Sequence, residues 1–125
     1  MATILLIDDY HSLRLLFKSA LEGAGYHVLT AEDGKPGLQL LENVMVDVIV
    51  MDICLPEMDG LELIPRIRRM QLGAKIIAMS GETDYLEIAT HLGADETIAK
   101  PFSPQDLLTA VSSQLNGARS QQPTP

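Results

Sequence analysis

The sequence predicts a doubly wound α/β domain, in which a five-stranded parallel sheet of order 2-1-3-4-5 carries helices on both faces. Two observations lead to this fold class. Short, almost wholly apolar runs fit strands that are buried on both faces. Between these runs lie segments whose apolar residues recur every three or four positions, as in amphipathic helices. The length of 125 residues suits one domain, and right-handed crossovers leave few strand orders open.

Four of the five expected strands are followed by a polar residue that can take part in chemistry. Asp8 and Asp9 follow the first strand, Asp52 the third, Ser80 the fourth and Lys100 the fifth. The carboxyl ends of parallel strands meet at one edge of the sheet, near the point where the strand order reverses. We therefore expect these side chains to converge. The predicted strands cover residues 4–7, 27–31, 48–51, 75–79 and 96–99.

The first three expected helices are defined by their apolar stripes. The stripe of the first helix includes Leu16. In the second helix Leu41 is expected to face inward, and Val44 is a further candidate for the same face. Pro36 fits the first turn of the second helix, where no hydrogen bond is lost. Pro65 falls inside the third helix and removes one hydrogen bond, which predicts a late start or a kink. These helices are expected over about 10–24, 36–44 and 61–70.

The fourth helix is expected over 83–92, and the fifth begins after an N-cap at Ser103. Asn116 and Gly117 are typical of a helix end. The sequence thus predicts one domain over residues 1–117, followed by a flexible tail or the start of a linker over 118–125.

Composition narrows the function classes. The chain has 17 acidic and 9 basic residues, a net charge of −8, which disfavours a nucleic-acid surface on this domain. A single cysteine, Cys54, excludes a disulfide framework. The chain shows neither a membrane-spanning apolar run nor a secretory signal pattern, so we expect a soluble, cytoplasmic protein.

Three carboxylates in one cleft must share protons or hold a cation. A like-charge pair 4 Å apart costs about 4 kcal/mol at an effective dielectric of 20. Oxygen ligands without histidine or cysteine side chains favour Mg²⁺, which commonly recruits phosphate oxygens. Lys100 and Ser80 supply a positive charge and a hydroxyl suited to a phosphoryl group. Each residue alone is more typical of a helix cap or a surface position, but their joint placement predicts phosphoryl chemistry.

At this point the sequence resembles the response-regulator receiver domains of two-component signalling. The resemblance covers about residues 3–116. It is carried by ILLIDDY at 4–10, VIVMDICLPEMDG at 48–60, IIAMSG at 76–81 and ADETIAKPF at 94–102.

The resemblance implies a role for each residue of the cleft. Asp52 matches the acceptor of a phosphoryl group from a histidine kinase or a histidine phosphotransfer protein. The Mg²⁺ ligands implied are Asp9, Asp52 and the backbone carbonyl of Cys54, with Asp8 acting mainly through water. Ser80 matches the switch hydroxyl that bonds a phosphoryl oxygen, and Lys100 matches the lysine that pairs with the phosphoryl group or with Asp52.

The family further implies that phosphorylation shifts the conformation of the face formed by the fourth helix, fifth strand and fifth helix. That face binds a downstream effector protein or an attached output domain, and a homodimer formed on phosphorylation is compatible with it. Glu82 matches a position that modulates the phosphorylated state, as does Cys54. Thr97 stands where the family usually has Tyr or Phe, so output coupling differs here. The implied protein is no enzyme beyond self-phosphorylation and slow autodephosphorylation.

Three alternatives stay open. A pseudo-receiver would use the same fold as an interaction module without phosphorylation, with Thr97 as its support. A flavin-binding electron carrier shares the topology, but Asp8 and Asp9 would repel a flavin phosphate. A metal-dependent phosphohydrolase would need a second acid–base group after Asp52, where the sequence has Ile53 and Cys54.

Overall fold

The computed structural model describes residues 1–120, with side chains through Gly117. Its strands form one parallel sheet in the order β2-β1-β3-β4-β5, which confirms the predicted topology. Order reverses between β1 and β3, so the carboxyl ends of these two neighbours open onto one crevice. The strands are β1 Thr3–Ile7, β2 His27–Ala31, β3 Val48–Asp52, β4 Lys75–Ser80 and β5 Glu96–Ala99.

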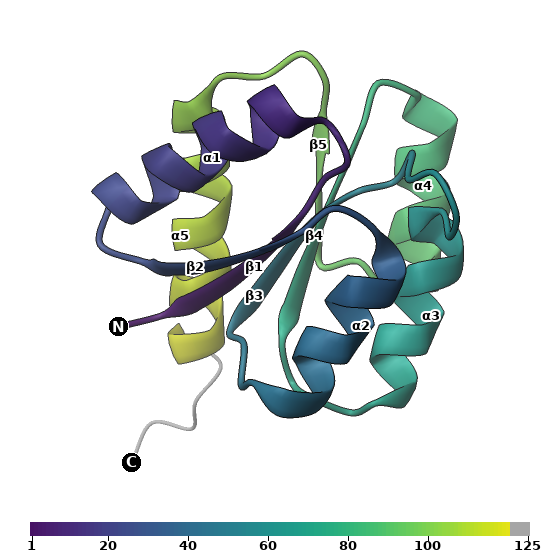
Figure 1. The fold of residues 1–125 in the computed structure, drawn as a ribbon, viewed down its shortest axis with the longest axis horizontal. Helices are drawn as coiled ribbons and strands as arrows, with labels where there is room; N and C mark the ends of the chain where they lie inside the picture. Colours follow the sequence, from purple (N-terminus) through teal and green to yellow (C-terminus); the bar gives the residue numbers. More distant parts are fainter. Residues whose placement is uncertain (121–125) are drawn as a thin grey trace.

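The helices form two layers, one on each side of the sheet. Figure 1 shows α1 and α5 on one face and α2, α3 and α4 on the other. Alternate residues of the central strands face each layer, so β1 and β3 are apolar at nearly every position. The helices are α1 His11–Gly23, α2 Gly34–Asn43, α3 Gly60–Arg69, α4 Thr83–Leu92 and α5 Pro104–Ser120. Within the described residues, none of them is both long and apolar enough to cross a membrane.

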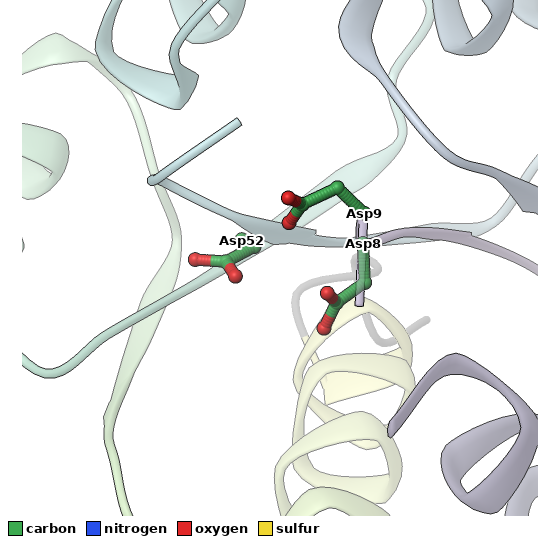
Figure 2. A group of neighbouring side chains, drawn as sticks. All are labelled: Asp8, Asp9 and Asp52. Atoms are coloured by element: carbon green, nitrogen blue, oxygen red, sulfur yellow. The ribbon is translucent and has the colours of Figure 1, made fainter. Parts of the chain in front are cut away.

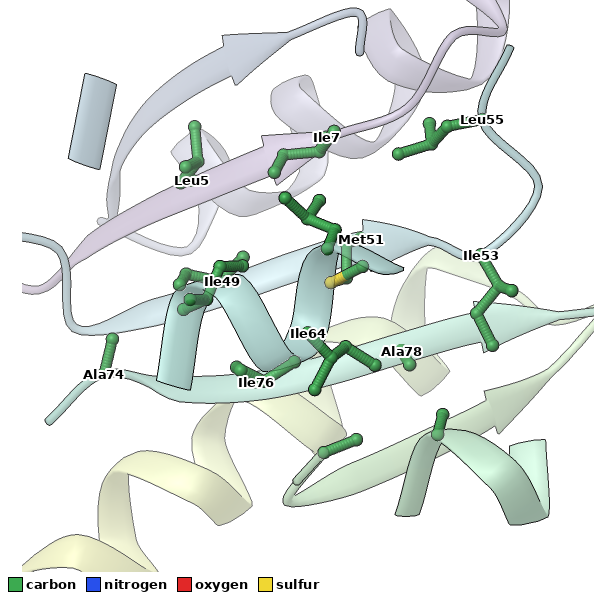
Figure 3. Packing of buried hydrophobic residues seen from close by; sticks show 14 of the residues in the cluster. Leu5, Ile7, Ile49, Met51, Ile53, Leu55, Ile64, Ala74, Ile76 and Ala78 are labelled. Atoms are coloured by element: carbon green, nitrogen blue, oxygen red, sulfur yellow. The ribbon is translucent and has the colours of Figure 1, made fainter. Parts of the chain in front are cut away.

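Each face of the sheet has its own apolar core. On the α2–α4 side, Ile7 and Met51 pack with Ile64 of α3, as Figure 3 shows. On the α1–α5 side, Phe17 lies against the strands and stacks on Phe102 with ring centroids 5.2 Å apart. Close packing in these two cores holds the ends of β1 and β3 in place. The polar residues that follow these strands are therefore held in fixed positions as well.

Three residues of the predicted apolar stripes, Leu16, Ala24 and Val44, are exposed and not in the core. Leu16 is 49% exposed and Val44 is 38% exposed. The buried surface of α1 is a narrow stripe around Phe17 and Leu21, and Leu16 lies beside it. Helix α2 also begins earlier than predicted, at Gly34, because the Asp33 side chain caps it by accepting the Gly34 N–H at 2.6 Å.

The expectation of a late start in α3 is wrong. The helix begins at Gly60, where the Asp59 carboxylate accepts the N–H of Glu62 at 3.0 Å as an N-cap. It then runs through Pro65, which leaves the carbonyl of Leu61 without a helical donor. Burial of the apolar face of α3 offsets that loss, since Leu63, Ile64 and Ile67 are all within the core.

The predicted helix end at Asn116 and Gly117 is also wrong, because α5 continues to Ser120. A glycine inside a helix costs about 1 kcal/mol relative to alanine, and a single such cost does not end a helix followed by good helix formers such as alanine and arginine. The predicted N-terminus is confirmed: Ser103 Oγ accepts the Asp106 N–H at 3.2 Å. Residues 121–125, the remainder of the predicted tail, lie outside the described part of the chain.

Candidate phosphoryl-transfer site

The sheet register brings the predicted site residues to one edge. Ile7, which precedes Asp8, pairs with Met51, which precedes Asp52. On the other side of β3, Asp52 pairs with Met79, and Ser80 pairs with Ala99, which precedes Lys100. All five predicted residues therefore lie at the carboxyl ends of strands, at the edge of the sheet that carries the crevice between β1 and β3.

The three predicted carboxylates form a close group. One carboxylate oxygen from each of Asp8, Asp9 and Asp52 lies within 4.8 Å of the others. Figure 2 shows the side chains next to one another, with Asp8 and Asp9 from the end of β1 and Asp52 from β3. Asp8 and Asp52 are buried and Asp9 is exposed, so the group is open to solvent on one side only.

Asp8 shows most directly that this group suits a cation. Its Oδ1 accepts the Tyr10 N–H at 2.9 Å, whereas its buried Oδ2 has no hydrogen-bond partner within the described residues. Burial raises the pKa of the Asp8 carboxyl above its ordinary value of 3.8, and the charges of Asp52 and Asp9 raise it further. The Tyr10 hydrogen bond and Lys100 oppose that rise in part. An orphaned buried carboxylate oxygen beside two other carboxylates is an all-oxygen donor set that could hold a metal ion.

Asp52 is held by two donors. Lys100 Nζ lies 2.8 Å from Oδ2, and the Cys54 N–H donates to Oδ1 at 3.1 Å. The Asp52 side chain is 7% exposed and that of Lys100 28%, so this ion pair is shielded from water on the Asp52 side. Lys100 thus neutralises part of the charge that the carboxylates would otherwise concentrate at one point.

Ser80 lies at the buried end of β4 and is engaged with the next segment. Its Oγ accepts the N–H of Glu82 at 3.0 Å. Glu82 itself is exposed and stands at the N-cap of α4 without a side-chain capping bond. Thr97 is half-buried on β5, in register with Ala78 of β4. Cys54 is an exposed residue, and partial desolvation of its thiol together with the Asp52 charge raises the pKa of that thiol.

Two features beside the site were not anticipated from the sequence. Asp9 lines a cleft of about 400 Å³ with Glu32, Asp33, Pro56 and Glu57. On the other side of the crevice, Lys100 lines an apolar groove of about 310 Å³ with Leu13, Phe17, Pro101 and Phe102. The sequence does place acids directly after the second strand, but which of them reach the cleft depends on loop paths that local patterns do not specify.

Asp8→Asn is expected to stabilise the metal-free protein at neutral pH by a few degrees in Tm. The raised pKa of Asp8 means that, as the pH rises above 3.8, the unfolded chain loses this proton before the folded protein does. In the parent protein the free energy of unfolding therefore decreases as the pH rises, until the folded Asp8 carboxyl has also ionised. Asparagine cannot ionise, so the variant does not show this decrease. Thermal denaturation in a chelator should show a difference that opens from acid to neutral pH. A variant less stable than the parent at neutral pH would contradict this assignment.

Comparison with known proteins agrees with this geometry. The family model described as "Response regulator receiver domain" matches residues 4–112. The alkaline phosphatase synthesis transcriptional regulatory protein PhoP of Bacillus subtilis is 35% identical over 114 residues, which is 90% of this chain and 48% of that protein. Response regulator SaeR of Staphylococcus aureus is 32% identical over 117 residues, which is 92% of this chain and 51% of SaeR. The chain thus spans about half the length of these curated relatives.

Solved structures match over almost the whole chain. The CheY-like receiver domain protein from Methanospirillum hungatei superposes with a TM-score of 0.91 at 31% identity, over 97% of this chain and 98% of that one. Chemotaxis response regulator CheY4 of Vibrio cholerae has a TM-score of 0.86 at 31% identity, with 91% and 98% covered. Together with the matched family model and the acidic crevice, these similarities show that the chain belongs to the response regulator receiver domain family of two-component signalling.

Proposed function

We propose that this domain accepts a phosphoryl group on Asp52 from a phosphorylated histidine of a kinase or a phosphotransfer protein. The observation that carries the proposal is the buried Asp52 carboxylate, which pairs with Lys100 at 2.8 Å and lies with Asp8 and Asp9 in one group of carboxylates. A lone buried carboxylate would be costly, and this arrangement of one lysine and three acids suits transfer of a dianionic group.

Asp9, Asp52 and the backbone carbonyl of Cys54 would hold Mg²⁺, with Asp8 acting through water. The orphaned Oδ2 of Asp8 and the all-oxygen donor set support that choice of ion. When bound, Mg²⁺ would supply positive charge to the oxygens of the transferring group. The prediction for Cys54 concerns its carbonyl, which leaves its exposed thiol free to flank the pocket.

The side chains of this chain perform the remaining steps. An Asp52 carboxylate oxygen attacks phosphorus in line, forming an acyl phosphate as the phosphorus–nitrogen bond to the donor histidine breaks. The donor imidazole keeps the electron pair of that bond and recovers a proton from solvent. Lys100 neutralises charge on the phosphoryl oxygens, and Ser80 donates its hydroxyl to one of them. The Cys54 N–H continues to orient the acceptor carboxylate.

Signal output follows from the position of Ser80 in the fold. Ser80 ends β4, and its Oγ accepts the N–H of Glu82 at the start of α4. If the hydroxyl turns to the phosphoryl group, α4 loses this hydrogen bond at its N-terminal end. The α4–β5–α5 face is then the surface that an effector protein, an attached output domain or a second copy would read. Tyr85 and Ile88 of α4 offer exposed apolar area on it, 41% and 43% exposed.

The donor protein needs a surface of its own next to Asp52. The apolar groove of Leu13, Phe17 and Phe102 reaches Lys100, and Leu16, three residues after Leu13 on α1, is 49% exposed. A helix of the donor protein with an apolar face fits such a groove and would bring its histidine to the acceptor.

Incubation with acetyl phosphate and Mg²⁺ tests the proposal. Intact mass should show one phosphoryl adduct per chain that survives acid, is lost in base and maps to Asp52. A chelator should prevent its formation because the oxygen donors alone repel the phosphodonor. No adduct in a folded, Mg²⁺-loaded protein would reject phosphoryl acceptance. Partner binding of equal strength with and without donor would then favour the interaction-only alternative, for which Thr97 is the supporting residue.

A further inference from the structure

The two ends of α4 are held very differently. The C-terminal end is fixed by a cluster that we name the Arg68 clamp, formed by Arg68 of α3 with Ala74, Gly93 and Asp95. Arg68 donates to the Gly93 carbonyl from Nε at 2.9 Å and from one terminal nitrogen at 2.6 Å, and to the Ala74 carbonyl from the other at 3.0 Å. All three guanidinium nitrogens are therefore used.

Asp95 ties this clamp to the sheet. Its carboxylate forms an ion pair with Arg68 and accepts the Ile76 N–H of β4 at 2.8 Å. The Asp95 N–H in turn donates to the Ile76 carbonyl at 2.8 Å. Gly93 has a φ of +125°, and a Cβ there would lie 3.0 Å from Cγ of Arg68, so the helix end and the arginine fit closely. Figure 1 shows α4 lying next to α3. Arg68 belongs to α3 and donates to the Gly93 carbonyl at the end of α4.

The N-terminal end of α4 has much weaker support. Glu82 provides no side-chain cap, and Thr83, Asp84 and Tyr85 are exposed. Among the described residues, the one hydrogen bond that joins this end to the sheet runs from the Glu82 N–H to Ser80 Oγ. The Glu82 carbonyl accepts the N–H of Tyr85 at 3.1 Å, so a displacement of Glu82 moves the first turn of the helix with it.

We propose that α4 pivots about the Arg68 clamp, with Ser80 releasing the opposite end of the helix. A ten-residue helix is about 15 Å long, so a tilt of about 10° moves its free end by about 2.6 Å while the clamped end stays in place. Arg68 is thereby a positioning residue, which confines the movement to the end nearest Asp52. The step in which phosphorylation draws Ser80 away rests on the proposed function. The asymmetry of the two helix ends does not.

Hydrogen exchange followed by mass spectrometry tests the pivot in the unmodified protein. Ser80→Ala removes the acceptor of the Glu82 N–H and should speed exchange in residues 82–88 roughly fivefold, with little change in 89–95. Arg68→Lys keeps the charge but cannot reach three acceptors at once, and should speed exchange in 89–95 instead. Arg69→Lys on the same helix is the matched control, since Arg69 is exposed and outside the clamp.

Combining Ser80→Ala with Arg68→Lys should spread fast exchange over both segments. Equal acceleration of both segments by Ser80→Ala alone, or an Arg68→Lys pattern that matches Arg69→Lys, would overturn the pivot. Circular dichroism identifies an unfolded variant, and Arg68→Gln then supplies the clamp test in its place.

A second arm adds Mg²⁺ and beryllofluoride, which mimics a phosphoryl group on aspartate. The parent protein should change exchange in 82–88 and not in 89–95, and the Arg68→Lys variant should change it in both. A change of equal size in both segments of the parent protein would contradict the pivot. If neither beryllofluoride nor acetyl phosphate binds, the proposed function fails, while the Ser80→Ala and Arg68→Lys exchange patterns still decide the pivot.

Discussion

Asp52→Asn is expected to abolish the phosphoryl adduct, lowering its rate of formation at least about 10³-fold. The amide that replaces the carboxylate has nearly the same shape but cannot form a stable acyl phosphate. Its carbonyl oxygen can still accept from Lys100, so the variant should fold. Intact-mass kinetics with acetyl phosphate and Mg²⁺ measure the loss, and circular dichroism checks the fold.

Asp59→Asn is the matched control for that experiment. Asp59 is an exposed aspartate seven residues further along, and asparagine can replace it as N-cap of α3. This control should be phosphorylated at the parental rate. An adduct that persists at the parental rate in Asp52→Asn, or that maps elsewhere in the parent protein, would remove Asp52 from the acceptor role.

Among the glycine-to-alanine substitutions in the described residues, Gly60→Ala is expected to be the most damaging, costing on the order of 3 kcal/mol in the free energy of unfolding. A Cβ at this position would lie 2.6 Å from the backbone Cα of Ile53 and 2.9 Å from the Met51 side chain. The Gly60 N–H also donates to the Ile53 carbonyl at 2.7 Å, so backbone must move to make room. Urea denaturation should show a lower midpoint with little change in slope.

The same substitution should slow phosphorylation, because Ile53 directly follows Asp52 and leads to Cys54, whose backbone carbonyl is a proposed Mg²⁺ ligand. Gly23→Ala serves as the control, since no atom lies within 4 Å of a Cβ built at Gly23 in the last position of α1. We expect that control to change the free energy of unfolding by less than about 1 kcal/mol. A Gly60→Ala variant as stable as Gly23→Ala would show that the contact between α3 and β3 is not tight.

Local sequence patterns predicted most of the fold because strand and helix signals agree along this chain. The bounds of α4 and β5 match the expectation to the residue. Gly93 marks the end of α4, and Lys100 with Pro101 marks the end of β5. Helix ends were predicted less well where a single residue that disfavours helix lay among neighbours that favour it. At Pro65, buried leucine and isoleucine side chains on both sides of the proline outweighed one lost hydrogen bond, and α5 likewise absorbed Gly117.

The sequence alone determined the run of five strands and the polar residues at their ends, and it predicted the sheet order as one of the few that right-handed crossovers leave open. Asp8, Asp9, Asp52, Ser80 and Lys100 each follow or end a strand, and parallel strands must bring such positions to one edge. A one-dimensional pattern carries that information because strand period and strand ends are local properties.

Only the tertiary structure decided which partner each of these groups has. Lys100 reaches Asp52, Ser80 Oγ is taken by Glu82, and Oδ2 of Asp8 is left without a donor. The clamp that joins Arg68 to Gly93 and Asp95 spans 25 and 27 residues of sequence. Such contacts depend on how two helices pack on the sheet and how their loops close, which no local pattern encodes.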